Sequence, residues 1–316
     1  MDILYTYKDV PAHLQGSVIA IGNFDGVHLG HKAILALTKQ IALDLQAKAG
    51  VMVFEPHPKA FFAPQTPFFY LSDISKKLEL LKECGLDVTT VLPFDHNLAQ
   101  LSAQDFVQKI LVQGLNVRHV IVGYDFHFGK GREGTAEKLK DLSEYYNFGI
   151  NILSKQSDGH EVYSSTRIRQ LLINGNVSAA SHVLGYYWRI SGKVIDGAKR
   201  GSSLLGIPTA NMALKVGQTL GHGIYAVRVY KDHACYLGAA YIGRRPTFDN
   251  GQAGLEVFLF DFEGDLYGQE IEVEFIEHIR EDAKFETLDA LKQQMHQDCE
   301  HAKQILQALQ QKKSAV

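Results

Sequence analysis

Two histidines near the N-terminus, His28 and His31, stand in a glycine-rich string whose composition suits phosphate chemistry. The string spans Gly22–His31 and reads Gly-Asn-Phe-Asp-Gly-Val-His-Leu-Gly-His. Glycines let a backbone approach a ligand closely. Imidazole N–H groups can donate hydrogen bonds to phosphate oxygens as negative charge develops on them during transfer. We therefore predict that His28 and His31 are catalytic residues of a phosphate-transferring site.

The elements on either side of this string predict where it lies. Ser17–Ile21 is a short apolar run bounded by turn residues, which indicates a buried strand. After the string, apolar residues recur at helical spacing at Ile34, Leu35, Leu37, Ile41 and Leu45. The histidines thus stand where a parallel strand turns into a helix. The N–H groups and positive dipole end of a helix start suit phosphate.

A zinc site, or an incidental pair, is the alternative explanation for two closely spaced histidines. Zinc requires further Cys or His ligands at short spacing. The three cysteines, Cys84, Cys235 and Cys299, are scattered and form no Cys-x-x-Cys. The full string after a predicted strand is far more specific than the two histidines alone, and it favours phosphate chemistry.

Composition bounds the class of protein. At 316 residues the chain is long for one domain and comfortable for two, and its 46% hydrophobic share is ordinary for a folded protein. A net charge of −3 gives no indication of a nucleic-acid or acidic-membrane partner. No apolar run approaches the ~18 residues of a membrane span, and the N-terminus is not a signal peptide. Few cysteines fit a reducing compartment. We expect a cytoplasmic protein with no membrane, nucleic-acid or obligate protein partner.

The N-terminal half alternates strands and helices. Beyond Ser17–Ile21, the pattern predicts strands at Val51–Phe54, Val88–Leu92, Val117–Val122 and Ile150–Leu153, and helices at Ile74–Leu81, Phe106–Leu111 and Ala136–Tyr146. Such alternation is typical of a mostly parallel, Rossmann-like α/β sheet covered on both faces. The ligand then binds at the carboxyl ends of the strands, where the Gly22–His31 string lies.

From about Ile190 the pattern changes to short strands separated by glycine-containing turns. These strands, at Tyr225–Tyr230, Leu255–Phe260 and Ile271–Ile276, predict an antiparallel sheet or small barrel. One or two helices follow between Leu288 and Leu309. Short helices at Ser164–Leu172 and Val177–Leu184 connect the halves. We place the domain boundary there and predict domains at 1–183 and 184–316.

Three further motifs in the first half have both a structural and a functional explanation. Phe54–Pro58 is either a rigid turn or a ligand contact. Val122–Gly129 either ends a strand or lines a cleft that stacks a planar ring. Hydroxyls at Ser164–Thr166 are ordinary N-caps. However, Arg167 and Arg169 oppose the helix dipole unless an anionic phosphate lies there, and Arg167 is the better candidate.

In this order and at these intervals, the four N-terminal strings closely resemble the N-terminal module of prokaryotic bifunctional riboflavin kinase/FAD synthetases, and Gly22–His31 resembles the signature of the nucleotidylyltransferase superfamily. The resemblance continues through the C-terminal riboflavin kinase module and covers essentially the whole chain. Its further strings are Gly192–Gly197, Leu205–Asn211, Gly223–Ala226, Ile242–Phe248, Glu256–Phe262, Asp265–Gly268 and Ile279–Arg280 with Lys284–Phe285.

The resemblance implies a two-step enzyme of flavin cofactor synthesis. Riboflavin and ATP give FMN in a C-terminal antiparallel barrel, and FMN and ATP give FAD and pyrophosphate in the N-terminal α/β domain, with Mg²⁺ accompanying ATP. It adds Arg167 to the catalytic histidines. The implied ATP- or phosphate-binding residues are Gly22, Phe24, Asp25, Gly30, Ser164, Ser165, Thr166, Gly197, Lys199 and Arg200, and the implied flavin-binding residues are Phe54, Pro56, Pro58, Asp125, Phe128 and Arg280.

In the second half, residue types alone say little. The absence of a Gly-x-x-x-x-Gly-Lys-Ser/Thr string excludes a P-loop kinase. Thr209 and Asn211 offer hard oxygen ligands suited to magnesium, although a plain loop is the default explanation, and the resemblance gives them the magnesium-nucleotide role. It makes Glu256 the general base for the riboflavin 5′-hydroxyl, the alternative being an edge-strand carboxylate in water. For Arg280 the alternative is a surface salt bridge.

Three positions depart from the family pattern. Ser202 stands where an Arg is expected, and Arg200 or Lys199 could supply that charge. Tyr241 replaces a common Asn, and His127 replaces a frequent Arg. The first two departures bear on kinase efficiency more than on kinase fold. Two alternatives therefore stay open: an FMN adenylyltransferase whose C-terminal module is only a flavin-binding scaffold, and a non-catalytic flavin-responsive regulatory protein.

Overall fold

The computed structural model describes residues 1–159, 161–195, 209–232, 234–244 and 253–314. The chain forms two compact units, Met1–Ser165 and Thr166–Val316. The sequence-based boundary between residues 183 and 184 stays a prediction. Predicted residues Gly197, Lys199 and Arg200, like Ser202, lie outside the described residues.

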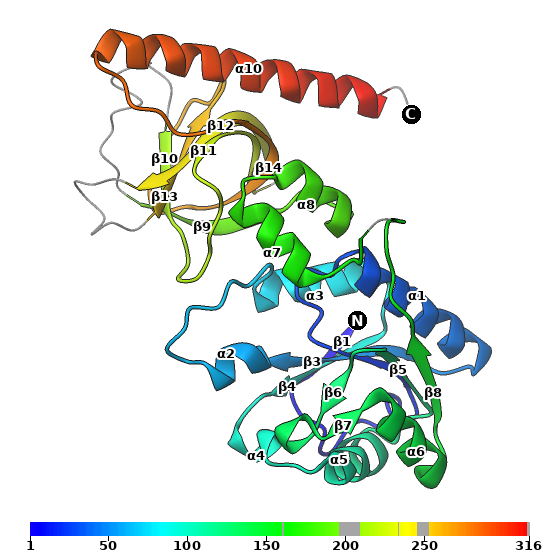
Figure 1. The fold of residues 1–316 in the computed structure, drawn as a ribbon. Helices are drawn as coiled ribbons and strands as arrows, with labels where there is room; N and C mark the ends of the chain where they lie inside the picture. Colours follow the sequence, from blue (N-terminus) through cyan, green and yellow to red (C-terminus); the bar gives the residue numbers. More distant parts are fainter. Residues whose placement is uncertain (160, 196–208, 233, 245–252, 315–316) are drawn as a thin grey trace. The chain divides into compact units, whose positions relative to one another are not determined.

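The first unit is built on a parallel six-stranded sheet in the order β1-β4-β3-β2-β5-β8 (Figure 1). Its strands are β1 (Asp2–Leu4), β2 (Val18–Ile21), β3 (Ala49–Glu55), β4 (Val88–Pro93), β5 (His119–Gly123) and β8 (Gly149–Leu153). The predicted parallel α/β sheet is confirmed. Only the edge strand β1 was not predicted, because three residues are too short to show a periodicity.

Helices cover both faces of this sheet. The longer ones are α1 (Leu29–Asp44), α3 (Ile74–Glu83), α6 (Ala136–Tyr146) and α5 (Ala103–Asp105), which continues as the π-helix η1 (Phe106–Gly114). Shorter elements are α2 (Pro58–Phe62), α4 (His96–Ala99), the 3₁₀ helix η2 (Lys130–Arg132), and the pair β6 (His127–Phe128) and β7 (Gly134–Thr135). The chain runs outward from β2 to β3 and β4, then returns to β5 on the other side of β2. In such sheets a ligand crevice forms at this reversal, next to the carboxyl end of β2.

The second unit is a closed antiparallel barrel in the order β10-β13-β12-β11-β14-β9, preceded by helices α7 (Ser165–Ile173) and α8 (Val177–Leu184) and followed by α10 (Leu288–Ser314). The strands are β9 (Arg189–Ile195), β10 (Thr209–Ala213), β11 (Gly223–Lys231), β12 (Ala234–Arg244), β13 (Ala253–Leu259) and β14 (Glu270–Arg280). The predicted barrel is confirmed. The default explanation of Thr209–Asn211 as a plain loop is wrong, because its ladder partners make it a strand.

The terminal helix is one helix rather than two, and it packs on the outer wall of the barrel. Ala226 and Ala239 are the small barrel residues that lie against Ala302 and Leu306 of α10. Small side chains on the wall let a helix approach closely. Within the described part of the chain, no helix has the length and apolarity needed to span a bilayer.

Candidate functional site

The loop that follows β2 adopts a backbone conformation that L-residues rarely accept. Phe24, Gly26 and Val27 have φ angles of 48°, 79° and 36°. A β-branched residue such as Val27 is an outlier at positive φ, and such residues cost about 1–3 kcal/mol each unless their surroundings hold them in place. Phe24 and Val27 are fully buried. Packing therefore holds a strained turn at the predicted ligand crevice.

His28 ends this loop as the N-cap of α1, where the sequence placed it. Its Nδ1 accepts a hydrogen bond from the His31 backbone N–H at 3.3 Å. With the Nδ1 lone pair engaged, the proton of the neutral ring resides on Nε2, which can then donate to a ligand. One nitrogen of His28 therefore folds the helix start, and the other is a hydrogen-bond donor.

His28 and His31 lie face to face. Their ring centroids are 3.6 Å apart and the rings are nearly parallel, and the Phe24 ring lies 4.9 Å from His31. A Cβ on Gly30 would lie 3.1 Å from Cε1 of His28, so glycine leaves room for the stacked pair. The structure thus brings together four of the predicted phosphate-site residues.

His31 is neutral near physiological pH. Burial, followed by the neighbouring His28 and Lys77, lowers the pKa of His31 well below its ordinary value. Its Nδ1 is buried and has no hydrogen-bond partner among the described residues. In a buried site a neutral imidazole can donate one N–H to an incoming anion without an initial charge of its own.

Asp25 anchors the strained loop to the rest of the first unit. Its carboxylate accepts hydrogen bonds from the backbone N–H groups of Leu71 (3.1 Å) and Ser72 (3.2 Å), and Ser72 Oγ accepts one from Gly26 N–H. Ser165 Oγ donates to the Asp25 carbonyl oxygen at 2.9 Å. Asp25 and Ser165 therefore hold the loop in place. Their predicted contact with the nucleotide stays a prediction.

The predicted flavin contacts of the first unit fall into two environments. Phe54 and Phe128 belong to one buried cluster, Phe54 against Phe94 and Phe128 against Phe106. Pro56 and Pro58 flank the N-cap of α2, while Asp125 is exposed in the loop between β5 and β6. The aromatic residues thus line the sheet core, and their contact with a flavin stays a prediction.

Arg167 stands at the third position of α7 and belongs to the second unit. Its neighbours Ser164 and Thr166 flank the first residue of that helix. The catalytic role of Arg167, and the phosphate contacts of Ser164 and Thr166, stay predictions.

Lys77, a charged residue that interacts electrostatically with His31, was not among the residues predicted from the sequence. Lys77 lies on the inner face of α3 together with Leu80 and Leu81. The signal was present, because a lysine at i+3 from Ile74 and i−4 from Leu81 interrupts the apolar stripe of a helix.

In the barrel, three polar residues far apart in sequence stand side by side. Asn211 of β10 and Tyr241 of β12 are both register partners of Glu256 in the intervening strand β13. Directly opposed residues share one face of a sheet with Cβ atoms about 5 Å apart. Glu256 is half-buried and β13 is paired on both sides, so the alternative of an edge-strand carboxylate is wrong.

Asn211 of this row and Thr209 of the same strand are residue types that fit magnesium. Asn211 carries an amide oxygen and is 5% exposed, and Thr209 precedes it by two residues in the same strand. Mg²⁺ held by nucleotide phosphates needs only one or two oxygen ligands from the protein. Among the described residues, no cluster of three or more His, Cys, Asp or Glu side chains could hold a metal by itself.

Tyr241 and Arg280 of the barrel form hydrogen bonds with residues that follow β14 in the chain. Tyr241 donates from its hydroxyl to Asp282 at 2.9 Å. Arg280 forms a forked pair with Asp298 of α10, with N–O distances of 2.9 and 2.7 Å, and its remaining Nη1 donates to the Glu281 carbonyl. Since Asp298 is 5% exposed, this is no surface salt bridge. The predicted flavin contact of Arg280 stays a prediction.

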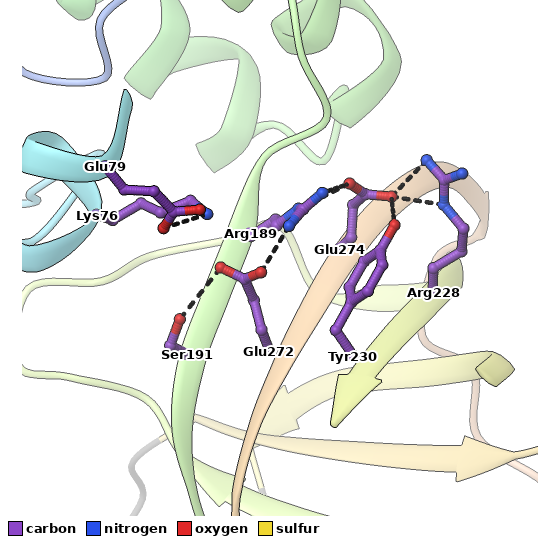
Figure 2. A network of polar contacts seen from close by, with 8 residues as sticks. All are labelled: Lys76, Glu79, Arg189, Ser191, Arg228, Tyr230, Glu272 and Glu274. Carbon is purple, nitrogen blue, oxygen red and sulfur yellow. Dashed lines mark hydrogen bonds and ion pairs between the residues drawn. The ribbon is translucent and has the colours of Figure 1, made fainter. Parts of the chain in front are cut away.

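A second charged network lies on the barrel wall, centred on Glu274 of β14. Figure 2 shows its carboxylate between Arg189 and Arg228, with Tyr230 donating at 3.2 Å and Arg189 also binding Glu272. Burial, followed by the Glu274 charge, raises the pKa of Tyr230 to about 12. Every member has a partner, so the network ties β9, β11 and β14 together without an evident ligand role.

Comparisons with known proteins match both units. The family model for FAD synthetase matches residues 10–167, and the model for riboflavin kinase matches residues 184–306. Curated proteins named bifunctional riboflavin kinase/FMN adenylyltransferase are similar over nearly the whole chain. That of Pseudomonas fluorescens is 40% identical (93% of this chain, 94% of its own), and that of Escherichia coli K12 is 39% identical (90% and 91%).

A crystal structure described as a macrolide-efflux protein from Streptococcus pneumoniae superposes with a TM-score of 0.84. It is 32% identical and covers 94% of this chain and 96% of its own. Its description names efflux, whereas both family models and the curated relatives name flavin enzymes. What this structure shares with the chain is the architecture of the two units.

Proposed function

The chain belongs to the family of bifunctional riboflavin kinases/FMN adenylyltransferases, and from this premise we propose which of its residues carry out each step. It phosphorylates riboflavin to FMN with ATP, and it adenylylates FMN with ATP to give FAD and pyrophosphate. Membership with both modules present favours this bifunctional activity over a lone adenylyltransferase or a non-catalytic regulator.

Adenylyl transfer takes place at the strained loop and the start of α1. An FMN phosphate oxygen attacks the α-phosphorus of ATP, and the bond to the leaving pyrophosphate breaks. His28 donates from Nε2 and His31 donates from its ring N–H to phosphate oxygens as their charge grows. The catalytic role of Arg167 that the family resemblance implies stays a prediction. No covalent enzyme intermediate is required, so positioning and charge stabilisation supply the rate enhancement. The cap geometry of His28 is the observation that carries this assignment.

Phosphorylation takes place at the row Asn211–Glu256–Tyr241. Glu256 accepts the proton of the riboflavin 5′-hydroxyl as that oxygen attacks the γ-phosphorus of ATP, and ADP leaves as its bond to that phosphorus breaks. Asn211 and Thr209 would hold a magnesium ion, which would neutralise charge on the nucleotide phosphates. Adjacent register positions for base and metal ligand support this division of roles.

One chromatographic assay tests both activities. The protein is incubated with ATP and Mg²⁺ and either riboflavin or FMN. We expect FMN and then FAD from riboflavin, and FAD alone from FMN. Failure to form FMN from riboflavin would leave only the adenylyltransferase and contradict the proposed kinase site.

We also propose that the units are separable near residue 184, as the change of sequence pattern indicates. Helix α8 contributes Val183 and Leu184 to the second unit's buried residues and packs against β14. Fragments 166–316 and 184–316 should both phosphorylate riboflavin, the longer one with the higher melting temperature. Loss of activity in both fragments would contradict a self-contained kinase module.

A further inference from the structure

Lys77 of α3 carries an ammonium group that the first unit encloses almost completely. The residue is 1% exposed, and its Nζ has no hydrogen-bond partner in the part of the chain that the structure describes. A charged amine in a protein interior normally has a carboxylate or several acceptors within reach. Burial lowers the pKa of Lys77 below its ordinary value, as expected for such a group. This arrangement costs stability, so it calls for an explanation.

The charged groups around Lys77 are those of the adenylyl-transfer site. Asp25 of the strained loop and Glu55 at the end of β3 attract it, and His31 of α1, stacked on His28, is repelled by it. Asp73, the N-cap of α3, acts on Glu55. Neither Asp25 nor Glu55 forms an ion pair with Lys77. The Asp25 carboxylate instead accepts hydrogen bonds from the backbone of Leu71 and Ser72.

We propose that Lys77 is a positioning residue for adenylyl transfer, which supplies positive charge near His31 for the phosphates that the imidazoles bind. This rests on the proposed role of His28 and His31. The incoming ATP and FMN carry several negative charges, whereas a neutral imidazole at His31 offers only a dipole. A fixed charge in a dry interior keeps much of its field, and it needs no reorganisation during the reaction. Lys77 also helps to hold His31 neutral until a phosphate arrives.

A structural role and this electrostatic role predict opposite effects of one substitution. Lys77→Met introduces an unbranched side chain of similar length that fills much of the same space without the charge. If Lys77 served only packing or folding, removal of its charge would leave FAD formation unchanged or lower it together with stability. If it serves the reaction, the variant should be as stable as the wild type or more so, yet poorer in catalysis. Such a gain in stability with a loss of activity is typical of functional strain.

The test compares Lys77→Met with Lys82→Met, an exposed lysine of the same helix. We expect Lys77→Met to melt at or above the wild-type temperature and to lose about 10- to 100-fold in kcat for FAD formation from FMN. Phosphorylation of riboflavin by the same protein should be unchanged. The pKa of His31, followed by NMR of the imidazole, should rise in Lys77→Met and not in Lys82→Met.

Three outcomes would overturn the inference: FAD formation equal to that of Lys82→Met, an unchanged His31 pKa, or losses of activity and melting temperature in parallel. Lys77→Arg covers the case in which Lys77→Met does not fold. It retains the charge, so it should keep more FAD formation than Lys77→Gln, and equal losses would refute the proposal. Replacement of His28 and His31 tests the proposed function separately, since activity in their absence would show that the site lies elsewhere.

Discussion

The two units position the residues that we propose to be reactive by different physical means. In the first, they lie on a short continuous loop and the helix start after it, held by buried side chains and by hydrogen bonds to Asp25. In the second, they lie on separate strands and become neighbours through ladder register alone. A loop site depends on the few contacts that hold its conformation, whereas a register site depends on the whole barrel. Substitutions in the loop of the first unit should therefore change activity with little change in stability. In the barrel, a substitution that disturbs the strand register should change both.

The largest effect is expected from His28→Ala combined with His31→Ala. One lost transition-state donor costs about 10²–10³ in rate, so the double variant should form no measurable FAD from FMN. Formation of FMN from riboflavin should persist, since that reaction belongs to the barrel. His28→Asn is the matched variant, because asparagine keeps an N-cap acceptor. If the double variant forms FAD at a near wild-type rate, the loop is not the site.

Glu256→Gln should give the reverse pattern. The amide keeps the shape of the side chain but accepts no proton, and loss of a positioned base typically costs about 10²–10⁴ in rate. FMN production from riboflavin should fall by that factor, while FAD production from supplied FMN serves as the internal control. Undiminished phosphorylation would assign the base to another residue.

A smaller effect, on stability, is expected from Arg280→Met. It leaves Asp298 buried without its forked partner, which should lower the free energy of unfolding of the second unit by about 3 kcal/mol. Trp188, the chain's single tryptophan, is buried in that unit and reports its unfolding by fluorescence.

Asp298→Leu in the same protein should restore much of that loss, as in a double-mutant cycle. The double variant also isolates the predicted flavin contact. If its KM for riboflavin equals that of the wild type, Arg280 is structural only; a raised KM at restored stability supports flavin binding.

The smallest effect is a dependence of the first unit's stability on pH. The pKa of His31 is lowered in the folded state, so the unfolded chain binds more protons below the ordinary value of 6.5. Stability contributed by neutral His31 is present above pH 6.5 and falls as the pH drops toward the lowered pKa, by at most about 1.4 kcal/mol per pH unit. The variant His31→Gln should show a shallower fall in circular dichroism melts between pH 5 and 7. An identical slope would contradict a buried neutral His31.

The same contrast explains what could be predicted from the sequence. The α/β unit was predictable because its strands and helices alternate with clear periods and its proposed site is one contiguous string, Gly22–His31. The row Asn211–Glu256–Tyr241 was not, because cross-strand register is a long-range property and no local pattern links these positions. Thr209–Ala213 was not predicted as a strand from its residues, since its β-structure depends on pairing with β9 and β13. Lys77 was missed because the apolar periodicity was used only to predict the helix at Ile74–Leu81. The lysine that interrupts its apolar face was not considered as a possible site residue.

His28 illustrates how one residue can be under two selective requirements at once. Its Nδ1 accepts the first-turn N–H of α1, a task that Ser, Thr, Asn or Asp could perform equally well. Its opposite nitrogen, the proposed phosphate donor, lies across a rigid ring that those shorter side chains lack. Only a residue that meets both requirements is acceptable at position 28. Replacement of His28 by a residue that only caps the helix would therefore give a folded protein without the proposed phosphate donor. Selection for activity, rather than for folding, would then be what keeps a histidine at this position.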